Sequence, residues 1–187
     1  MPGTVTPAQM YDHELNVLKG WPSPYAVEKP AKIDATETLT ILAGRCCYLT
    51  ASGGLKMGCP YNKADALAPM PMWAWPNSSD FDVSGDVGNT ISGTMMALPA
   101  KGAYEFETTE FKGTGFLPNQ ALCADAGSTA ADRGLVKCRS LAATGSGNED
   151  MVVGIVSTGP KGEVGIHTNS YGKSVVSFWP VYLPLVV

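Results

Sequence analysis

The chain has 187 residues and a net charge of −4, and only 16% of its residues are charged. This length suffices for one folded domain with a terminal arm, and the negative charge without a long basic run argues against a nucleic-acid partner. The 21 glycines and 14 prolines interrupt the chain too often for long helices. We therefore predict an all-β domain built from many short strands, as a sandwich or a barrel.

Residues 1–36 differ in composition from the rest and are predicted to form an extended N-terminal arm. The run TPAQ at residues 6–9 resembles a capping box with proline at the first helical position, which is compatible with a short helix over residues 7–19. The ten residues that begin at Trp21 contain three prolines. Such a segment forms neither a helix nor a central strand, so an extended course is expected.

The large side chains of this arm need cover, because a buried Trp or Tyr removes about 150–250 Å2 from water. Two interpretations stay open: the arm packs on its own domain, or it grips a neighbouring subunit. The candidate subunit-interface residues of the arm are Leu15, Leu18, Trp21, Pro22, Tyr25 and Val27.

The folded body is expected over residues 37–187 and begins with a β-hairpin. In Ile41–Cys59 an apolar run meets the turn sequence ASGG, and a short second strand follows. A looser copy occurs at Phe116–Cys138. The repeat predicts two related hairpin halves, separated by a long insertion at about residues 60–115.

The remaining strands are expected near residues 70–76, 91–98, 103–111, 151–156 and 174–187. In the third of these, aromatic residues alternate with carboxylates. Alternation of this kind predicts a strand with one buried face. Glu105 and Glu107 would then lie together on the other, solvated face, although a glycosidase-like carboxylate pair is the alternative.

Neither a targeting signal nor a membrane segment is expected. The N-terminus lacks a basic start followed by an apolar run. The apolar stretch Val175–Val187 contains two prolines and is shorter than the roughly 20 residues of a spanning helix. The five cysteines show no Cys-x-x-Cys spacing, so we expect small buried side chains in a reducing compartment, with no metal and no cofactor.

No motif carries catalysis. The run from Asp80 to Gly85 resembles the start of a calcium loop, but the twelfth position is Ile91 instead of a glutamate. The Gly-Lys-Ser sequence at residues 172–174 lacks the leading glycine of a phosphate loop. The two histidines, His13 and His167, have no nucleophile elbow beside them. We therefore assign no catalytic residues.

Three of the four tryptophans precede proline. Proline within a strand pattern favours an edge or a strand end, and an exposed tryptophan there is a candidate for an interface. The alternative is that these side chains form the domain core. The candidate interface tryptophans, for which a place in the core is the alternative, are Trp73, Trp75 and Trp179.

From about Leu15 onward the chain resembles capsid decoration (cement) proteins and related head structural proteins of tailed bacteriophages. The segments that carry the resemblance are LNVLKGWPSPYAVEKP, ILAGRCCYLTASGGLKMG, PMWAWPNSSDFDV, ALPAKGAYEFETTEF, MVVGIVSTGP and SVVSFWPVYLP. The insertion at Pro60–Gly115 is longer than in minimal members of this class.

The resemblance implies a β-tulip or barrel-like domain that forms a homotrimer on the capsid exterior. It further implies that the N-terminal arm reaches over the major capsid protein, that the protein assembles in the host cytoplasm, and that it has no enzymatic residues. Two alternatives stay open: another phage structural subunit of the tail or fibre, and a carbohydrate-binding module or hydrolase that uses Glu105, Glu107 or the tryptophans.

Overall fold

The computed structural model describes residues 15–19, 29–37, 41, 44–50, 52–58, 71–75, 94–99, 105–125, 127, 129, 131–139 and 152–183. Within these residues the protein consists of strands and turns without a helix, so the all-β prediction is confirmed. Accordingly, this part of the chain contains no helix with the length and apolar character that crossing a membrane requires.

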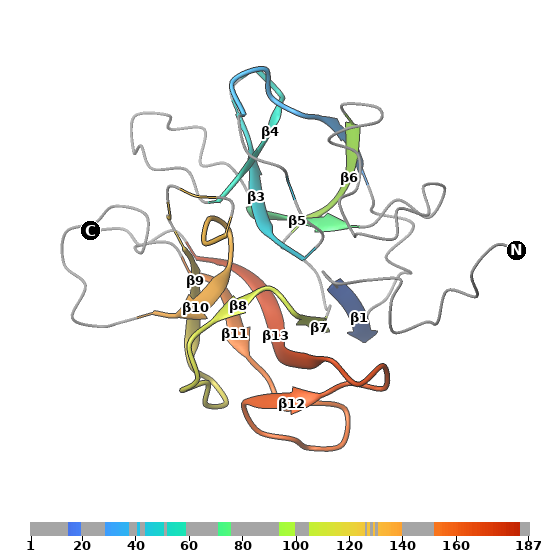
Figure 1. Ribbon diagram of the computed structural model, residues 1–187, viewed down its shortest axis with the longest axis vertical. Coiled ribbons are helices and arrows are strands. Elements are labelled where there is room, and N and C mark those ends of the chain that lie inside the picture. The colour runs from blue at the N-terminus through green and yellow to red at the C-terminus, as the bar shows by residue number, and fades with distance from the viewer. Residues whose placement is uncertain are drawn as a thin grey trace, which may run out of the picture.

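The strands form two sheets, which occupy the lower and upper parts of Figure 1. The larger sheet has eight strands in the order β1-β7-β13-β11-β9-β10-β8, and β12 pairs with β13 beside this path. Its members are β1 (Leu15–Lys19), β7 (Glu105–Thr108), β8 (Phe111–Lys112), β9 (Ala121–Ala124), β10 (Val136–Cys138), β11 (Val152–Val156), β12 (Ile166–Thr168) and β13 (Ser174–Leu183).

The smaller sheet has five strands in the order β2-β6-β5-β3-β4. A single isolated bridge from Ile33 to Leu55 brings the chain after β2 against β4, but neither sheet is closed into a barrel by strand pairing. Its members are β2 (Lys29–Lys32), β3 (Cys46–Leu49), β4 (Leu55–Met57), β5 (Pro71–Trp75) and β6 (Thr94–Pro99).

Both predicted hairpins are present, one in each sheet. The first pairs β3 with β4, and the second pairs β9 with β10, both antiparallel. The first turn depends on Gly53, whose φ of +81° lies in the region that glycine tolerates at no steric cost. The two hairpins also meet directly, since the Cys46 N–H donates to the Gly134 carbonyl at 2.9 Å.

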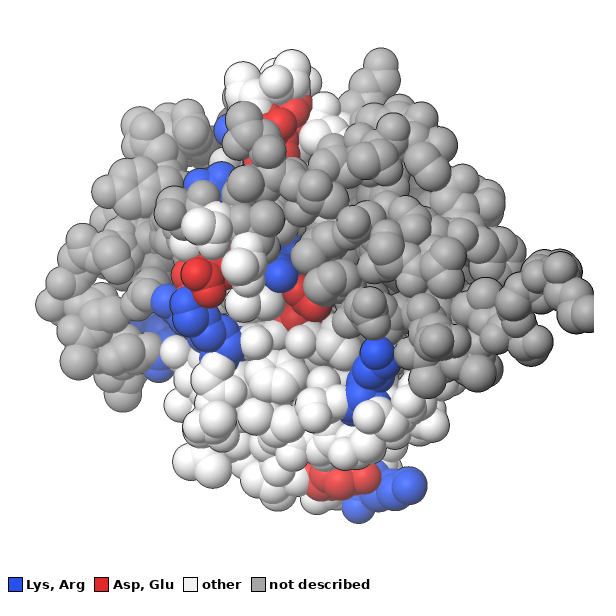
Figure 2. Space-filling view, viewed as in Figure 1, with Lys and Arg blue, Asp and Glu red and all other residues white. Residues whose placement is uncertain are grey.

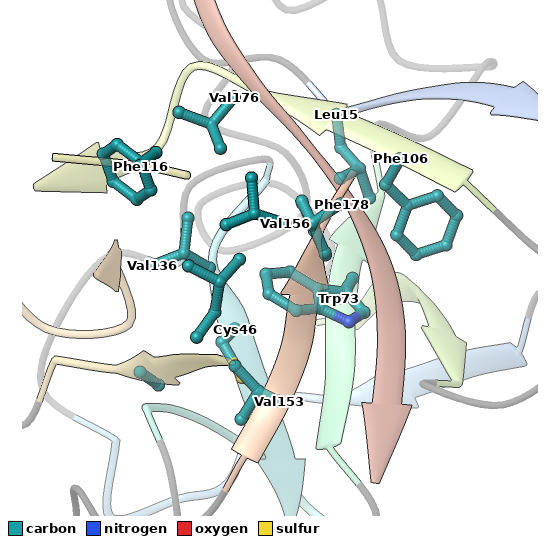
Figure 3. Close-up of a cluster of buried hydrophobic side chains, with 12 residues drawn as sticks. Leu15, Cys46, Trp73, Phe106, Phe116, Val136, Val153, Val156, Val176 and Phe178 are labelled. Carbon is teal, nitrogen blue, oxygen red and sulfur yellow. The ribbon is translucent and has the colours of Figure 1, made fainter. Parts of the chain in front are cut away.

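The core lies between the two sheets and is centred on three aromatic rings (Figure 3). Trp73 from the smaller sheet packs on Phe178 of the larger sheet with ring centroids 4.7 Å apart, and Phe106 completes the group. Burial of such rings supplies a large part of the hydrophobic stabilisation of a domain. Cys46, also in this cluster, behaves as the predicted small buried side chain.

The predicted helix over residues 7–19 is wrong for its described part, because Leu15–Lys19 is strand β1. This strand pairs with β7, so tertiary pairing outweighs the weak capping signal upstream. Residues 7–14 lie outside the described residues. In the described part of the arm, β1 and β2 each belong to one of the two sheets, which agrees with the interpretation that the arm packs on its own domain.

The described strands of the predicted insertion at about residues 60–115 are integral parts of the two sheets. Strands β5 and β6 form the middle of the smaller sheet, and β7 lies between β1 and β13 in the larger one. This span therefore supplies central strands to both sheets. The relatedness of the two hairpin halves stays a prediction.

Candidate functional site

A group of buried polar side chains lies on one face of the larger sheet. Because side chains alternate along a strand, Phe106 of β7 points into the core and Glu105 and Glu107 point to the opposite face. This face was expected to be solvated, but Glu105 is 2% and Glu107 5% exposed. The solvated-face prediction is therefore wrong, and these carboxylates must be stabilised by partners.

The partners of Glu107 come from the strands on either side of β7. Asn16 of β1 and Ser177 of β13 are its register partners. The Asn16 Nδ2 donates to Glu107 Oε1 at 3.0 Å. Three neighbouring strands thus place a row of polar side chains across this face of the sheet.

His167 of β12 lies at the end of this row. Its Nδ1 is 3.2 Å from the Gly165 carbonyl oxygen, and its Nε2 is 3.4 Å from Ser177 Oγ. A carbonyl oxygen can only accept, so Nδ1 carries the proton in the neutral ring and Nε2 accepts from the serine hydroxyl. The Glu107 Oε2 also faces Nε2, at 3.8 Å.

These residues do not have the geometry of a catalytic triad. In a Ser-His-acid triad the carboxylate accepts from Nδ1–H while the serine contacts Nε2. Here the carboxylate and the serine share Nε2, and a backbone carbonyl takes Nδ1. Ser177 is also only 1% exposed, so a substrate has no direct access to its hydroxyl. The arrangement is that of a buried structural network.

The loop before β12 closes over His167. A Cβ atom on Gly159 would lie 2.7 Å from Glu163 Oε2 and 2.9 Å from His167 Nε2, so a side chain there would have to displace the carboxylate and the imidazole ring. Backbone N–H groups of Glu163 and Lys161, together with the charge interaction with His167, hold the pKa of the Glu163 carboxyl below its usual range. Across the described part of the chain, no three His, Cys, Asp or Glu side chains gather in a way that could hold a metal ion.

The predicted interface tryptophans separate into different environments. Trp73 is fully buried, so the interface prediction is wrong for it and the core alternative is confirmed. The side chain of Trp75 lies outside the described residues. Trp179 of β13 is 37% exposed beside its register partner Ile155. Of the three, Trp179 is the described side chain that another molecule can reach.

The candidate interface residues of the arm also differ in how far the structure exposes them. Leu15 is 2% exposed and belongs to the core cluster, so it is not a free interface residue. Its burial follows from the pairing of β1 with β7, which carries this side chain into the core. Leu18 is half-buried. The others lie outside the described residues: Trp21, Pro22, Tyr25 and Val27.

The exposed large apolar side chains of the described residues share one half of the molecule. All of them belong to the chain from residue 111 to 183, which supplies six strands of the larger sheet. Figure 2 shows a largely uncharged area over the lower part of the molecule, where this sheet lies in Figure 1, with charged side chains along its margins. These side chains are Leu117, Val164, Tyr171 and Trp179.

Burial weakens the carbohydrate-binding alternative. Trp73, Glu105 and Glu107, on which it partly rested, are all inaccessible. The Gly-Lys-Ser sequence lies at the end of the turn that joins β12 to β13, where Gly172 has a φ of +79° and Asn169 Oδ1 accepts from the Lys173 N–H. The candidate calcium loop at residues 80–85 lies outside the described residues.

The buried network around His167 escaped sequence reasoning. Its members are separated by up to 161 positions, from Asn16 to Ser177, and become neighbours only through the strand order β1-β7-β13.

Comparison of the chain with protein-family models, with curated proteins and with solved structures finds no match.

Proposed function

We propose that this chain is a non-enzymatic structural protein of a bacteriophage virion, which binds the outside of the assembled capsid and stabilises it as a decoration protein. Its partners are the major capsid protein and further copies of itself in a homotrimer. The resemblance of six sequence segments to capsid decoration proteins supports this proposal. The all-β architecture is compatible with it.

The observation that carries the proposal is the exposure of Trp179. This side chain projects from the middle of β13 and is 37% exposed. Tryptophan is enriched among the residues that dominate protein interfaces, because its large ring loses much contact with water on binding. The larger sheet and the turns between its strands carry the other exposed large apolar side chains of the described residues.

The chemistry of the buried polar residues supports a structural role. Ser177, His167 and Glu107 are the residues most suited to nucleophilic catalysis, but they contact each other in the wrong order and are shielded from solvent. Such a network stabilises a sheet face rather than acting on a substrate.

A shell is a favourable partner for a surface of this kind. Once one copy of a trimer has bound the capsid lattice, the other two copies are held close to their own binding sites. Their binding is then effectively intramolecular. Weak apolar contacts of single copies then sum to firm attachment. Charge is not needed for this attachment, which agrees with the low charged fraction of 16%.

The test is co-sedimentation with empty shells assembled from the major capsid protein encoded nearest to this gene. We expect the wild type to sediment with the shells and Trp179→Ala to bind about 30-fold more weakly, since a central interface aromatic contributes about 2 kcal/mol or more. Thr168→Ala is the control, because Thr168 is an exposed polar residue of the same sheet that does not belong to the group of exposed apolar side chains. Undiminished binding by Trp179→Ala would contradict the proposal.

A further inference from the structure

The hydrogen bonds around His167 have more acceptors than donors while the ring is neutral. Its Nε2 then accepts, and it faces Glu107 Oε2, a second acceptor, at 3.8 Å. The Ser177 hydroxyl lies 3.4 Å from Nε2 and has a single hydrogen to donate. The side chains of His167 and Glu107 are only 5% and 6% exposed, so water offers little compensation for an acceptor that lacks a donor.

A second carboxylate approaches the same nitrogen from the loop between β11 and β12. Glu163 Oε2 and His167 Nε2 both lie within 2.9 Å of the position that a Cβ atom on Gly159 would take. The Lys161 backbone N–H donates to Glu163 Oε2 at 2.7 Å and holds this carboxylate in place. Carboxylates from two different elements therefore meet at one ring nitrogen.

The charged groups around this nitrogen in the described elements are mainly acidic. On β7, Glu105 lies on the same face as Glu107, and its register partner on β1 is Lys19. In the loop, the charge of Lys161 acts on Glu163. The nearest side chain of β13 is the uncharged Ser177. Such surroundings favour a positive charge on the ring.

We propose that protonation of His167 fastens the β12 hairpin to β7 and makes it a pH-dependent switch. A proton on Nε2 converts this acceptor into a donor toward Glu107 of β7 and Glu163 of the loop. The Nδ1–H keeps its contact with the Gly165 carbonyl. Histidine is the side chain whose charge changes between pH 5 and 8, so mild acid strengthens the attachment.

The fastened segment carries part of the exposed apolar surface. Val164, which is 56% exposed, precedes β12, and Tyr171, which is 54% exposed, follows it. In the described part of the chain β12 pairs with β13 alone, through three residue pairs. Its attachment therefore depends strongly on His167, and acid should order both apolar side chains. This proposal concerns the chain by itself and does not rest on shell binding.

Urea unfolding between pH 8 and pH 5.5 tests the switch. A proton that binds the folded state more tightly adds stability below the titration of an unfolded histidine, at about pH 6.5, and this stability is lost as the pH rises. The measured quantity is the unfolding equilibrium constant of the wild type divided by that of His167→Gln. It should fall at least about fivefold from pH 8 to pH 5.5, as expected for about tenfold tighter proton binding. A ratio that stays constant or rises on acidification overturns the proposal.

Two further variants assign the effect to this contact. His13→Gln removes the other histidine of the chain and should keep the pH dependence of the wild type. Glu107→Gln provides an amide hydrogen in place of the proton, so its stability should depend less on pH over this range. A pH dependence that disappears in His13→Gln, or that Glu107→Gln leaves unchanged, contradicts the proposal.

A measurement on the wild type does not depend on the folding of any variant. Nitrogen-15 NMR of the histidine rings should show His167 with one ring N–H at pH 8 and two at pH 5.5. After correction for intrinsic rates, the amides of Ile166–Thr168 should exchange at least about fivefold more slowly at pH 5.5, in proportion to the tighter proton binding. The amides of Val136–Cys138 in β10 are the control and should not change. A His167 ring that stays neutral at pH 5.5 overturns the proposal.

Discussion

Arg45 and Glu110 form a buried ion pair across the two sheets, although 65 positions separate them in the chain. Arg45 lies just before β3 of the smaller sheet, and Glu110 lies between β7 and β8 of the larger one. The guanidinium also donates to the Arg133 carbonyl at 2.8 Å, in the loop of the second hairpin. One side chain therefore connects both hairpins and both sheets.

Removing one partner of this pair should cost more than removing both. Arg45→Met leaves the Glu110 carboxylate buried without its charge partner, and such a change typically costs about 3–5 kcal/mol. Arg45→Met/Glu110→Leu buries no unpaired charge and should recover most of that loss. Urea unfolding of the wild type, both single variants and the double variant measures this. Equal losses in the single and double variants would show that the pair is not coupled.

Gly134 should be required for its lack of a side chain as well as for its conformation. Its φ is +79°, and a Cβ atom there would lie 2.8 Å from the Cys46 carbonyl oxygen. Gly162 has a similar φ of +83° with no atom near the Cβ position. Gly162→Ala should cost about 1–2 kcal/mol for the left-handed backbone, and Gly134→Ala should cost at least about 1 kcal/mol more. Equal unfolding midpoints for the two variants would argue against the predicted clash.

Asp34 should make the fold sensitive to acid. Hydrogen bonds from Thr36, Thr50 and Ser52 hold the pKa of this carboxyl well below its usual range. A lowered pKa in the folded state means that the stabilisation is complete above the unfolded pKa of about 3.9 and is lost as the pH falls below it.

The comparison of wild type with Asp34→Asn isolates this contribution. Between about pH 5 and pH 2.5, the free energy of unfolding of the wild type should fall more steeply than that of the variant, which has no carboxyl to protonate at this position. Urea titrations at several pH values measure both curves. Parallel curves would mean that Asp34 does not contribute to the acid sensitivity.

Ser177 should be unreactive toward serine-directed reagents in the folded protein. It is 1% exposed, and its neighbour His167 is not held by a carboxylate on Nδ1. A fluorophosphonate probe at neutral pH should therefore leave the folded chain unlabelled. Labelling that disappears in Ser177→Ala would instead indicate an activated serine and a hydrolytic function.

The sequence predicts those features of the fold that depend on local signals. Gly53 and its neighbours mark the first turn, and the cluster of small residues after Cys123 marks the second. Both hairpins therefore form where the turn chemistry places them. The strand at Leu15–Lys19 is missed because its signal is five residues long and follows a capping-box pattern.

The burial of polar residues depends on information that is not local. Alternation places Glu107 on the face opposite Phe106, but whether that face is solvated depends on which strands lie beside β7. The partners Asn16 and Ser177 come from distant parts of the chain. The same limit applies to Trp73 and Trp179, which look alike in sequence and are distinguished by the position of their strands in the two sheets.

The most direct test of the central claim is cryo-electron microscopy of virions produced from a genome that encodes this chain. The proposed function predicts density for the chain on the outer surface of the head, in groups of three copies at the local symmetry axes, with the surface around Trp179 against the major capsid protein. Density for the chain in the tail or fibre would instead support the alternative structural role. Its absence from the virion would contradict the proposed function altogether.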